Sequence, residues 1–291
     1  MMKIIDPHLH LFDLEEGEYQ WLKAENPPFW SDKKVITHNF TEKDLQLSSL
    51  FELAGFVHIE AGFDNQQPWR EIAWLEETCS LPFRSIASIN LLLPSKEFQQ
   101  VLDKLCQYES VVGVRDIFDD NAFEYLSNPV VQKNLSILAK QQFIFECQMP
   151  LADVVATTQL MKVLNVLPTL KLVINHAGYP PRDVKSEPWK DWQQNLKSLC
   201  DYENISIKCS GFEMINRDYS AIWQQLVINQ CLKTFGLYKT MLASNFPLCL
   251  FKGSYQENWL SHKQNNQLST TTTTIEFLCY KNTQRIYQIL L

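Results

Sequence analysis

The chain has 291 residues, of which 45% are hydrophobic and 20% are charged. These are ordinary values for a globular protein, so they provide for a sizeable core and exclude disorder of the whole chain. The 26 basic and 33 acidic residues give a net charge of −7 without any basic stripe, which argues against nucleic acid as a partner.

The sequence also argues against a membrane protein. No apolar run approaches the roughly 18 residues that a membrane span requires, and Asp6 precedes any hydrophobic segment of signal-peptide length. The eight cysteines include no C-x-x-C pair, so we expect reduced and mostly buried thiols. We therefore expect a cytoplasmic protein with no membrane partner, and a homo-oligomer stays possible.

Short apolar runs alternate with helical stretches from end to end, which is typical of βα units that build a parallel sheet. Eight strands are predicted: one within 3–12, then 54–61, 83–90, 111–116, 143–148, 170–176, 205–210 and 241–246. Helices are predicted at 68–78, 96–108, 129–141, 151–165, 189–202 and 219–235. Eight strands that alternate with helices favour an α/β fold of the (β/α)8 TIM barrel type.

Three local features complete the prediction. Asn128 followed by Pro129 is a start signal for a helix, with an N-cap and proline at the first helical position. The threonines 270–274 are predicted to be a loop that leads into a final helix at 275–290. Residues 13–40 are too many for a plain βα connection, so we expect a loop over the barrel mouth within one domain, 1–291.

His8 and His10 are the most informative residues of the opening strand. Side chains two apart on a strand share a face, so the two imidazoles leave the same surface about 7 Å apart at Cα. Two histidines placed in this way could ligate a metal ion or polarise a substrate oxygen.

Polar residues end most of the predicted strands, where a TIM barrel carries its chemistry. Because unpaired polar groups inside a barrel are costly, a cluster at one end is better explained by a solvated site than by packing. The cluster comprises His8, His10, His58, Glu60, Arg115, Glu146, Gln148, His176, Lys208 and Asn245.

Several of these residues also have a structural interpretation. His58 could be a hydrogen-bonded interior histidine, and Lys208 could extend its charge from a partly buried strand. Arg115 could pair with a loop aspartate, yet a guanidinium at a barrel mouth commonly holds a carboxylate. Glu146, if buried, needs a partner or has a raised pKa that would suit a general acid or base.

Other catalytic motifs are absent from the sequence. No G-x-G-x-x-G or G-x-x-x-x-G-K-[ST] motif occurs among the eight glycines, so nucleotide phosphates lack their usual binding loop. No G-x-S-x-G motif occurs either, which removes the common serine hydrolase interpretation.

The motifs at these strand ends resemble those of the amidohydrolase superfamily, in the branch of amidohydrolase-related TIM-barrel hydrolases that includes sugar-acid lactonases and the pyrone dicarboxylate lactonase. The resemblance runs nearly end to end and covers Ile5–Asp13 and the aromatic loop at Tyr19–Leu22. It continues through Val57–Ala61, Gly113–Arg115, Asn175–Gly178, Lys208–Gly211, Ser244–Pro247 and Asn282–Tyr287.

The resemblance implies a hydrolase that opens a lactone or related cyclic ester of a small acid. It implies that His8, His10 and His176 surround the reacting carbonyl, with or without one divalent metal ion, of which zinc is the first candidate. Arg115 and Lys208, together with His58 and Trp21, would bind a small substrate that is anionic or rich in hydroxyl groups. A decarboxylase or an amide hydrolase on the same scaffold is the alternative.

One residue departs from the pattern of the superfamily. An aspartate after the eighth strand takes a proton from the attacking water in much of the superfamily, and here that position is Asn245. An amide oxygen is too weak a base for this role. Glu60 or Glu146 could serve as the base, the histidine pair could do so without metal, or the barrel could bind a metabolite without turning it over.

Overall fold

The strands of the computed structural model, which describes residues 1–264 and 272–291, form one parallel sheet in chain order. They are β1 (Met2–Leu9), β2 (Phe51–Ile59), β3 (Phe83–Ser88), β4 (Val111–Ile117), β5 (Ile144–Gln148), β6 (Lys171–Ile174), β7 (Ile205–Cys209) and β8 (Thr240–Leu242). The backbone of β1 meets the segment after β8, where Asn245 N donates to His8 O at 2.9 Å. These contacts confirm the predicted single-domain (β/α)8 barrel.

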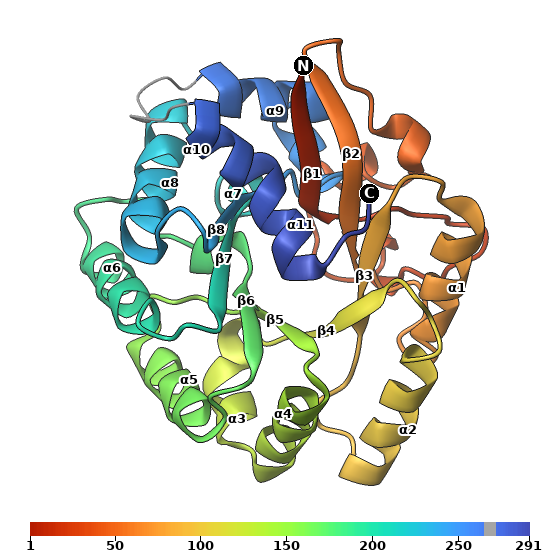
Figure 1. The fold of residues 1–291 in the computed structure, drawn as a ribbon, viewed down its shortest axis with the longest axis vertical. Helices are drawn as coiled ribbons and strands as arrows, with labels where there is room; N and C mark the ends of the chain where they lie inside the picture. The colour runs from red at the N-terminus through yellow and green to blue at the C-terminus, as the bar shows by residue number, and fades with distance from the viewer. Residues whose placement is uncertain (265–271) are drawn as a thin grey trace.

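Helices surround the barrel and run between successive strands (Figure 1). Six of them confirm the predicted helices: α1 (Trp69–Thr78), α2 (Ser95–Leu105), α4 (Pro129–Gln141), α5 (Val154–Val166), α6 (Glu187–Leu199) and α8 (Ala221–Phe235). Three were not predicted: α3 (Ala122–Ser127), α7 (Phe212–Ile215) and α9 (Tyr255–Gln264). The described part of the chain has no helix that combines the length and the apolar character needed to cross a membrane.

The start of α4 confirms the predicted cap. The Asn128 side chain accepts a hydrogen bond from Val130 N at 2.8 Å, and Pro129 occupies the first turn, where its missing N–H costs nothing. This cap fixes the beginning of the helix that packs behind β5.

The C-terminal segment differs in part from the prediction. Residues 272–274 are helical, since α10 spans Thr272–Glu276, so the predicted threonine loop is wrong there; residues 270 and 271 lie outside the described residues. The final helix is confirmed as η7 (Phe277–Lys281), a π-helical turn, followed by α11 (Asn282–Tyr287). Helix α11 crosses the centre of the barrel in Figure 1.

The core has two layers, because side chains alternate between the two faces of each strand. Outward residues such as Cys147 and Cys209 pack beneath the helices, which confirms that these two thiols are core residues. The inward residues of the strands form a second cluster: Ile5, Val57, Ile59, Ile86, Ile144, Val173 and Met241. Tyr287 and Ile289 of the C-terminal segment also belong to this cluster. The apolar inner layer thus fills the barrel below the polar strand ends.

The segment 13–40 is folded rather than extended. It contains two 3-10 turns, Gln20–Leu22 and Lys33–Val35. The buried Lys33 ammonium donates to the backbone oxygens of Trp21 at 2.9 Å and of Asn26 at 2.8 Å, which ties the segment together.

Candidate active site

A cavity of about 830 Å³ opens at the carboxyl ends of the strands. Of the predicted site residues, His10, Trp21, Glu60, Arg115, Gln148, His176 and Asn245 line this cavity. The remaining ones, His8, His58, Glu146 and Lys208, are buried and do not line it. Trp21 reaches the cavity from the segment 13–40, and its indole N–H donates to Ala61 O at 2.7 Å.

His8, His10 and His176 converge as the sequence predicted. The ring centroid of His8 lies 5.2 Å from that of His10 and 4.7 Å from that of His176. The loop after β7 needs a glycine here, because a Cβ on Gly211 would lie 2.3 Å from Nδ1 of His176. Gly211 also has a φ of +66°, a left-handed conformation that glycine adopts without strain.

The hydrogen bonds of the ring nitrogens decide what these histidines can do. His10 Nδ1 lies 2.8 Å from Ile59 O, which only accepts, so the proton is on Nδ1 and Nε2 keeps its lone pair. His176 Nδ1 lies 3.0 Å from Ser210 Oγ, a hydroxyl that can donate or accept. In both His10 and His176 the hydrogen bond is made by Nδ1, so Nε2 is not used to hold the ring in place.

All three imidazoles are neutral at pH 7. Burial lowers the pKa of each well below 6.5. The positive charge of Arg115 lowers all three pKa values further, and that of Lys208 lowers those of His8 and His176. The site thus offers neutral imidazoles rather than imidazolium cations.

Arg115 is held by Glu60 rather than by Asp116 or Asp119. Its Nε donates to Glu60 Oε1 at 2.8 Å, and a second nitrogen donates to the Glu60 backbone oxygen at 2.9 Å. A third bond joins the guanidinium to Gln148 Oε1 at 3.1 Å. Both charged side chains line the cavity, so they present a paired, nearly neutral surface to a ligand.

Glu146 and Lys208 form a second ion pair deeper in the barrel. Lys208 Nζ donates to Glu146 Oε1 at 2.8 Å, and both side chains are fully buried. Asn175 and Tyr287 also donate to the Glu146 carboxylate. Burial lowers the pKa of Lys208 to about 8, although the charge of Glu146 opposes this shift.

His58 is buried beside Glu71, a residue that the sequence did not indicate as part of the site. The distance from His58 Nε2 to Glu71 Oε1 is 3.8 Å, which is too long for a hydrogen bond. Burial lowers the pKa of His58 to about 3 and raises that of Glu71 well above its usual range. The pair therefore lies in the barrel wall in its neutral form.

Asn245 is held by a second unpredicted carboxylate. Its Nδ2 donates to Glu213 Oε1 at 2.6 Å, and burial raises the pKa of Glu213 to about 7. Glu213 is on α7, a single turn directly after β7. The only sequence signal for it was a carboxylate three residues beyond the end of the predicted strand 205–210.

Asp6 is a third unpredicted carboxylate. It is fully buried between β1 and the segment after β8, where it accepts hydrogen bonds from the backbone N–H groups of His8 at 3.2 Å and Ser244 at 3.1 Å. Burial raises its pKa to about 6, although these hydrogen bonds oppose the shift. Asp6 thus fixes the strand end that carries His8.

The donor set for a metal ion is incomplete. Both ring nitrogens of His8 are buried without a hydrogen-bond partner among the described residues, and His10 Nε2 keeps a lone pair, so two histidines could contribute. However, no three His, Cys, Asp or Glu side chains of the described part are arranged to hold a metal ion. Arg115 and Lys208 also add positive charge beside the rings.

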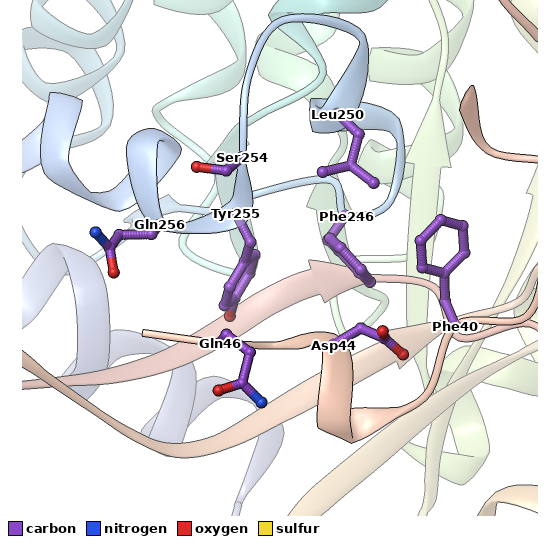
Figure 2. Close-up of a pocket in the computed structure, with 8 residues that line it drawn as sticks. All are labelled: Phe40, Asp44, Gln46, Phe246, Leu250, Ser254, Tyr255 and Gln256. Carbon is purple, nitrogen blue, oxygen red and sulfur yellow. The ribbon is translucent and has the colours of Figure 1, made fainter. Parts of the chain in front are cut away.

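A second cavity of about 430 Å³ lies between residues 40–46 and the segment from Phe246 to Gln256 (Figure 2). Phe40, Phe246, Leu250 and Tyr255 supply its apolar part. None of the predicted site residues lines it.

Comparisons with known proteins agree with this architecture. A family model described as Amidohydrolase matches residues 5–289. A protein of Sinorhizobium fredii, named uncharacterized protein y4mH, is 26% identical over an alignment of 275 residues, and the match covers 90% of each chain.

Solved structures share the fold at low sequence identity. An amidohydrolase from Burkholderia multivorans with bound zinc has a TM-score of 0.80 at 15% identity, with 99% of each chain covered. A probable 2-pyrone-4,6-dicarboxylic acid hydrolase from Acinetobacter baumannii with bound citric acid has a TM-score of 0.69 at 17% identity, with 99% of this chain and 100% of that chain covered. Decarboxylases are also among the structures that share the fold.

Proposed function

The chain belongs to the amidohydrolase family, and from this premise we propose that it hydrolyses a lactone or related cyclic ester of a small, hydroxyl-rich acid. The observation that carries the proposal is that His10, His176 and Asn245, from three different strand ends, line one cavity. A carbonyl group that enters this cavity meets two neutral imidazoles and an amide.

The composition of the cavity favours a neutral substrate rich in hydroxyl groups over an anionic one. Three carboxylates line it, those of Glu60, Asp116 and Asp119, against the single guanidinium of Arg115, which Glu60 already neutralises. Amide and aromatic side chains make up much of the remaining lining: Trp21, Trp30, Asn65, Asn90, Tyr125, Gln148, Tyr179 and Asn245. Such groups bind sugar hydroxyls, whereas the excess of carboxylates repels a dicarboxylate.

The two imidazoles that line the cavity divide the chemistry between them. If the Ser210 hydroxyl donates to Nδ1 of His176, the proton of that neutral ring is on Nε2, from which it can donate to the substrate carbonyl oxygen. His10 Nε2 can accept a hydrogen bond from water and so orient it toward the carbonyl carbon. No step of this scheme requires a metal ion, for which the donor set is incomplete.

Hydrolysis of a panel of sugar-acid lactones, followed by NMR analysis of the products, tests the proposal. We expect ring-opened hydroxy acids, and we expect His10→Ala to lower kcat/KM by at least about 100-fold because it removes a group that contacts the attacking water. His38→Ala is the matched control, since His38 is exposed and does not line the cavity.

Other results would redirect or end the proposal. If no lactone of the panel is hydrolysed at high protein concentration, the lactonase assignment is wrong, and the alternative is a barrel that binds a metabolite without turning it over. Release of carbon dioxide from an aromatic acid would show a decarboxylase instead. Elemental analysis, together with prolonged chelation, tests the role of metal: we expect substoichiometric metal and unchanged turnover after chelation.

A further inference from the structure

The proposed hydrolysis needs a base, and the two carboxylates indicated by the sequence are already engaged. Glu60 Oε1 accepts from Arg115 Nε at 2.8 Å, and Glu146 Oε1 accepts from Lys208 Nζ at 2.8 Å. A carboxylate within an ion pair is stabilised in its charged form and gives up that interaction if it takes a proton. Glu146 is also fully buried, and its hydrogen-bond partners Lys208, Asn175 and Tyr287 do not line the cavity.

Glu213 has a different environment. Its side chain is only 3% exposed, and no Lys, Arg or His of the described residues forms an ion pair with it. The side chain that holds it is the neutral amide of Asn245, which donates to Oε1 at 2.6 Å. Protonation of Glu213 therefore breaks no ion pair.

The position of Glu213 relates it directly to the missing aspartate. Asn245 lines the cavity, and the Glu213 carboxylate touches the Asn245 side chain from the neighbouring strand end. Because a carboxylate only accepts, the amide nitrogen of Asn245 faces Glu213. Met214, the next residue along the chain, lines the cavity too. Glu213 itself does not line the cavity, but its partner Asn245 does, so the carboxylate lies one hydrogen bond behind the cavity wall.

We propose that Glu213 is the general base of this site and takes the role of the aspartate that much of the superfamily has at the position of Asn245. The inference rests on the proposed lactone hydrolysis. The water oxygen forms a bond to the carbonyl carbon while its proton passes to the Glu213 carboxylate through one further water, because Glu213 does not itself line the cavity. The tetrahedral intermediate then breaks its bond to the ring oxygen, and Glu213 returns the proton to that oxygen, which gives the hydroxy acid.

The charges around Glu213 are compatible with this exchange of protons. Arg217, four residues along, donates to the Glu213 backbone oxygen at 2.6 Å rather than to its carboxylate. The groups that approach from other elements, Tyr179, Tyr219 and Cys249, all have pKa values raised by burial and are neutral at pH 7. A carboxyl group whose pKa lies near 7 can both accept and return a proton at neutral pH.

Glu213→Gln is the first test, because glutamine keeps an oxygen that can accept from Asn245. We expect kcat to fall by about 100-fold or more with little change in KM, and the acidic limb of the kcat/KM pH profile near pH 7 to disappear. A purely structural role would leave that limb in place. A variant that retains more than about a third of the activity with the same acidic limb would overturn the proposal.

The exchanged pair provides the second test. Asn245→Asp alone places two carboxylates in contact, so they share a proton and the acidic limb moves to higher pH. In the double variant Asn245→Asp/Glu213→Gln the hydrogen bond is reversed, and we expect activity within about tenfold of the native protein. A double variant that folds but is as inactive as Glu213→Gln would contradict the proposal.

A titration without substrate separates this inference from the proposed function. Carboxyl 13C NMR of glutamate-labelled protein is measured across the pH range, and the resonance absent from Glu213→Gln identifies the residue. If the native protein opens no lactone, the proposed function fails, yet the titration still decides the inference. A midpoint near pH 7 supports a poised base, and a midpoint below about pH 5 overturns it.

Discussion

Two kinds of buried carboxylate lie near the carboxyl ends of the barrel strands. Glu60 and Glu146 are each bound by a cation, through Arg115 and Lys208. Asp6 and Glu213 are bound by neutral donors, and burial raises their pKa values to about 6 and about 7. The same side-chain chemistry therefore has two outcomes, which depend on the charge of the partner.

The contrast separates structural groups from groups that can exchange protons. A buried carboxylate beside a cation forms an ion pair between neighbouring parts of the barrel, here between the residue after β2 and β4, and between β5 and β7. A buried carboxylate beside an amide or hydroxyl is more easily protonated, because no charge compensates its desolvation. The second kind can take up a proton without breaking an ion pair.

Removing the cation from an ion pair should have the largest effect on stability. Lys208→Met leaves the Glu146 charge buried and unpaired, so we expect the free energy of unfolding to fall by about 3–5 kcal/mol in urea denaturation. Lys190→Met is the control, since it removes a cation from the exposed Lys190–Glu187 pair, where solvent screens the charges, and should leave stability almost unchanged. Equal losses in the two variants would contradict the distinction.

Glu213→Gln should alter the pH dependence of stability. The pKa of Glu213 is raised from its usual 4.5 to about 7 in the folded protein, so the unfolded chain loses this proton first as pH rises. Ionised Glu213 therefore destabilises the fold as pH rises from about 4.5 to about 7. We expect the glutamine variant to be more stable than the native protein by up to about 3 kcal/mol at pH 8, with no gain at pH 4.5.

Thermal or urea unfolding of both proteins at several pH values measures this difference. A stability gain that is the same at every pH would mean that the Glu213 carboxyl does not titrate within this window. The buried histidines act in the opposite direction in both proteins, because their lowered pKa values make stability fall as pH drops below 6.5. Because both proteins contain the same histidines, the contribution of these residues cancels in the stability difference between the native protein and Glu213→Gln.

Arg115→Lys tests whether geometry adds to charge in the first kind of pair. Lysine keeps the positive charge, yet it cannot reach Glu60 and Gln148 together with the fork of bonds that the guanidinium makes. We expect a loss of about 1–2 kcal/mol in the free energy of unfolding, measured in urea. Unchanged stability would show that the charge alone holds Glu60.

The strands and the histidines of the site followed from local sequence. The alternating βα pattern and the polar residues at the strand ends predicted the barrel. Because parallel strands end at the same side of a barrel, they also predicted that His8, His10 and His176 lie close together, as their ring distances show. Such periodicity is a property of neighbours along the chain, so the sequence alone carries it.

The partners of the charged residues were decided by the tertiary structure. The separation of Glu60 from Arg115 is 55 residues, and that of Glu146 from Lys208 is 62, so no local pattern links them. Glu213 lies on a single turn that reads as an ordinary loop, and it gains its role only because closure of the barrel brings Asn245 against it. Whether a carboxylate is paired with a cation or with an amide depends on distances across the barrel mouth, and these exist only once the chain has folded.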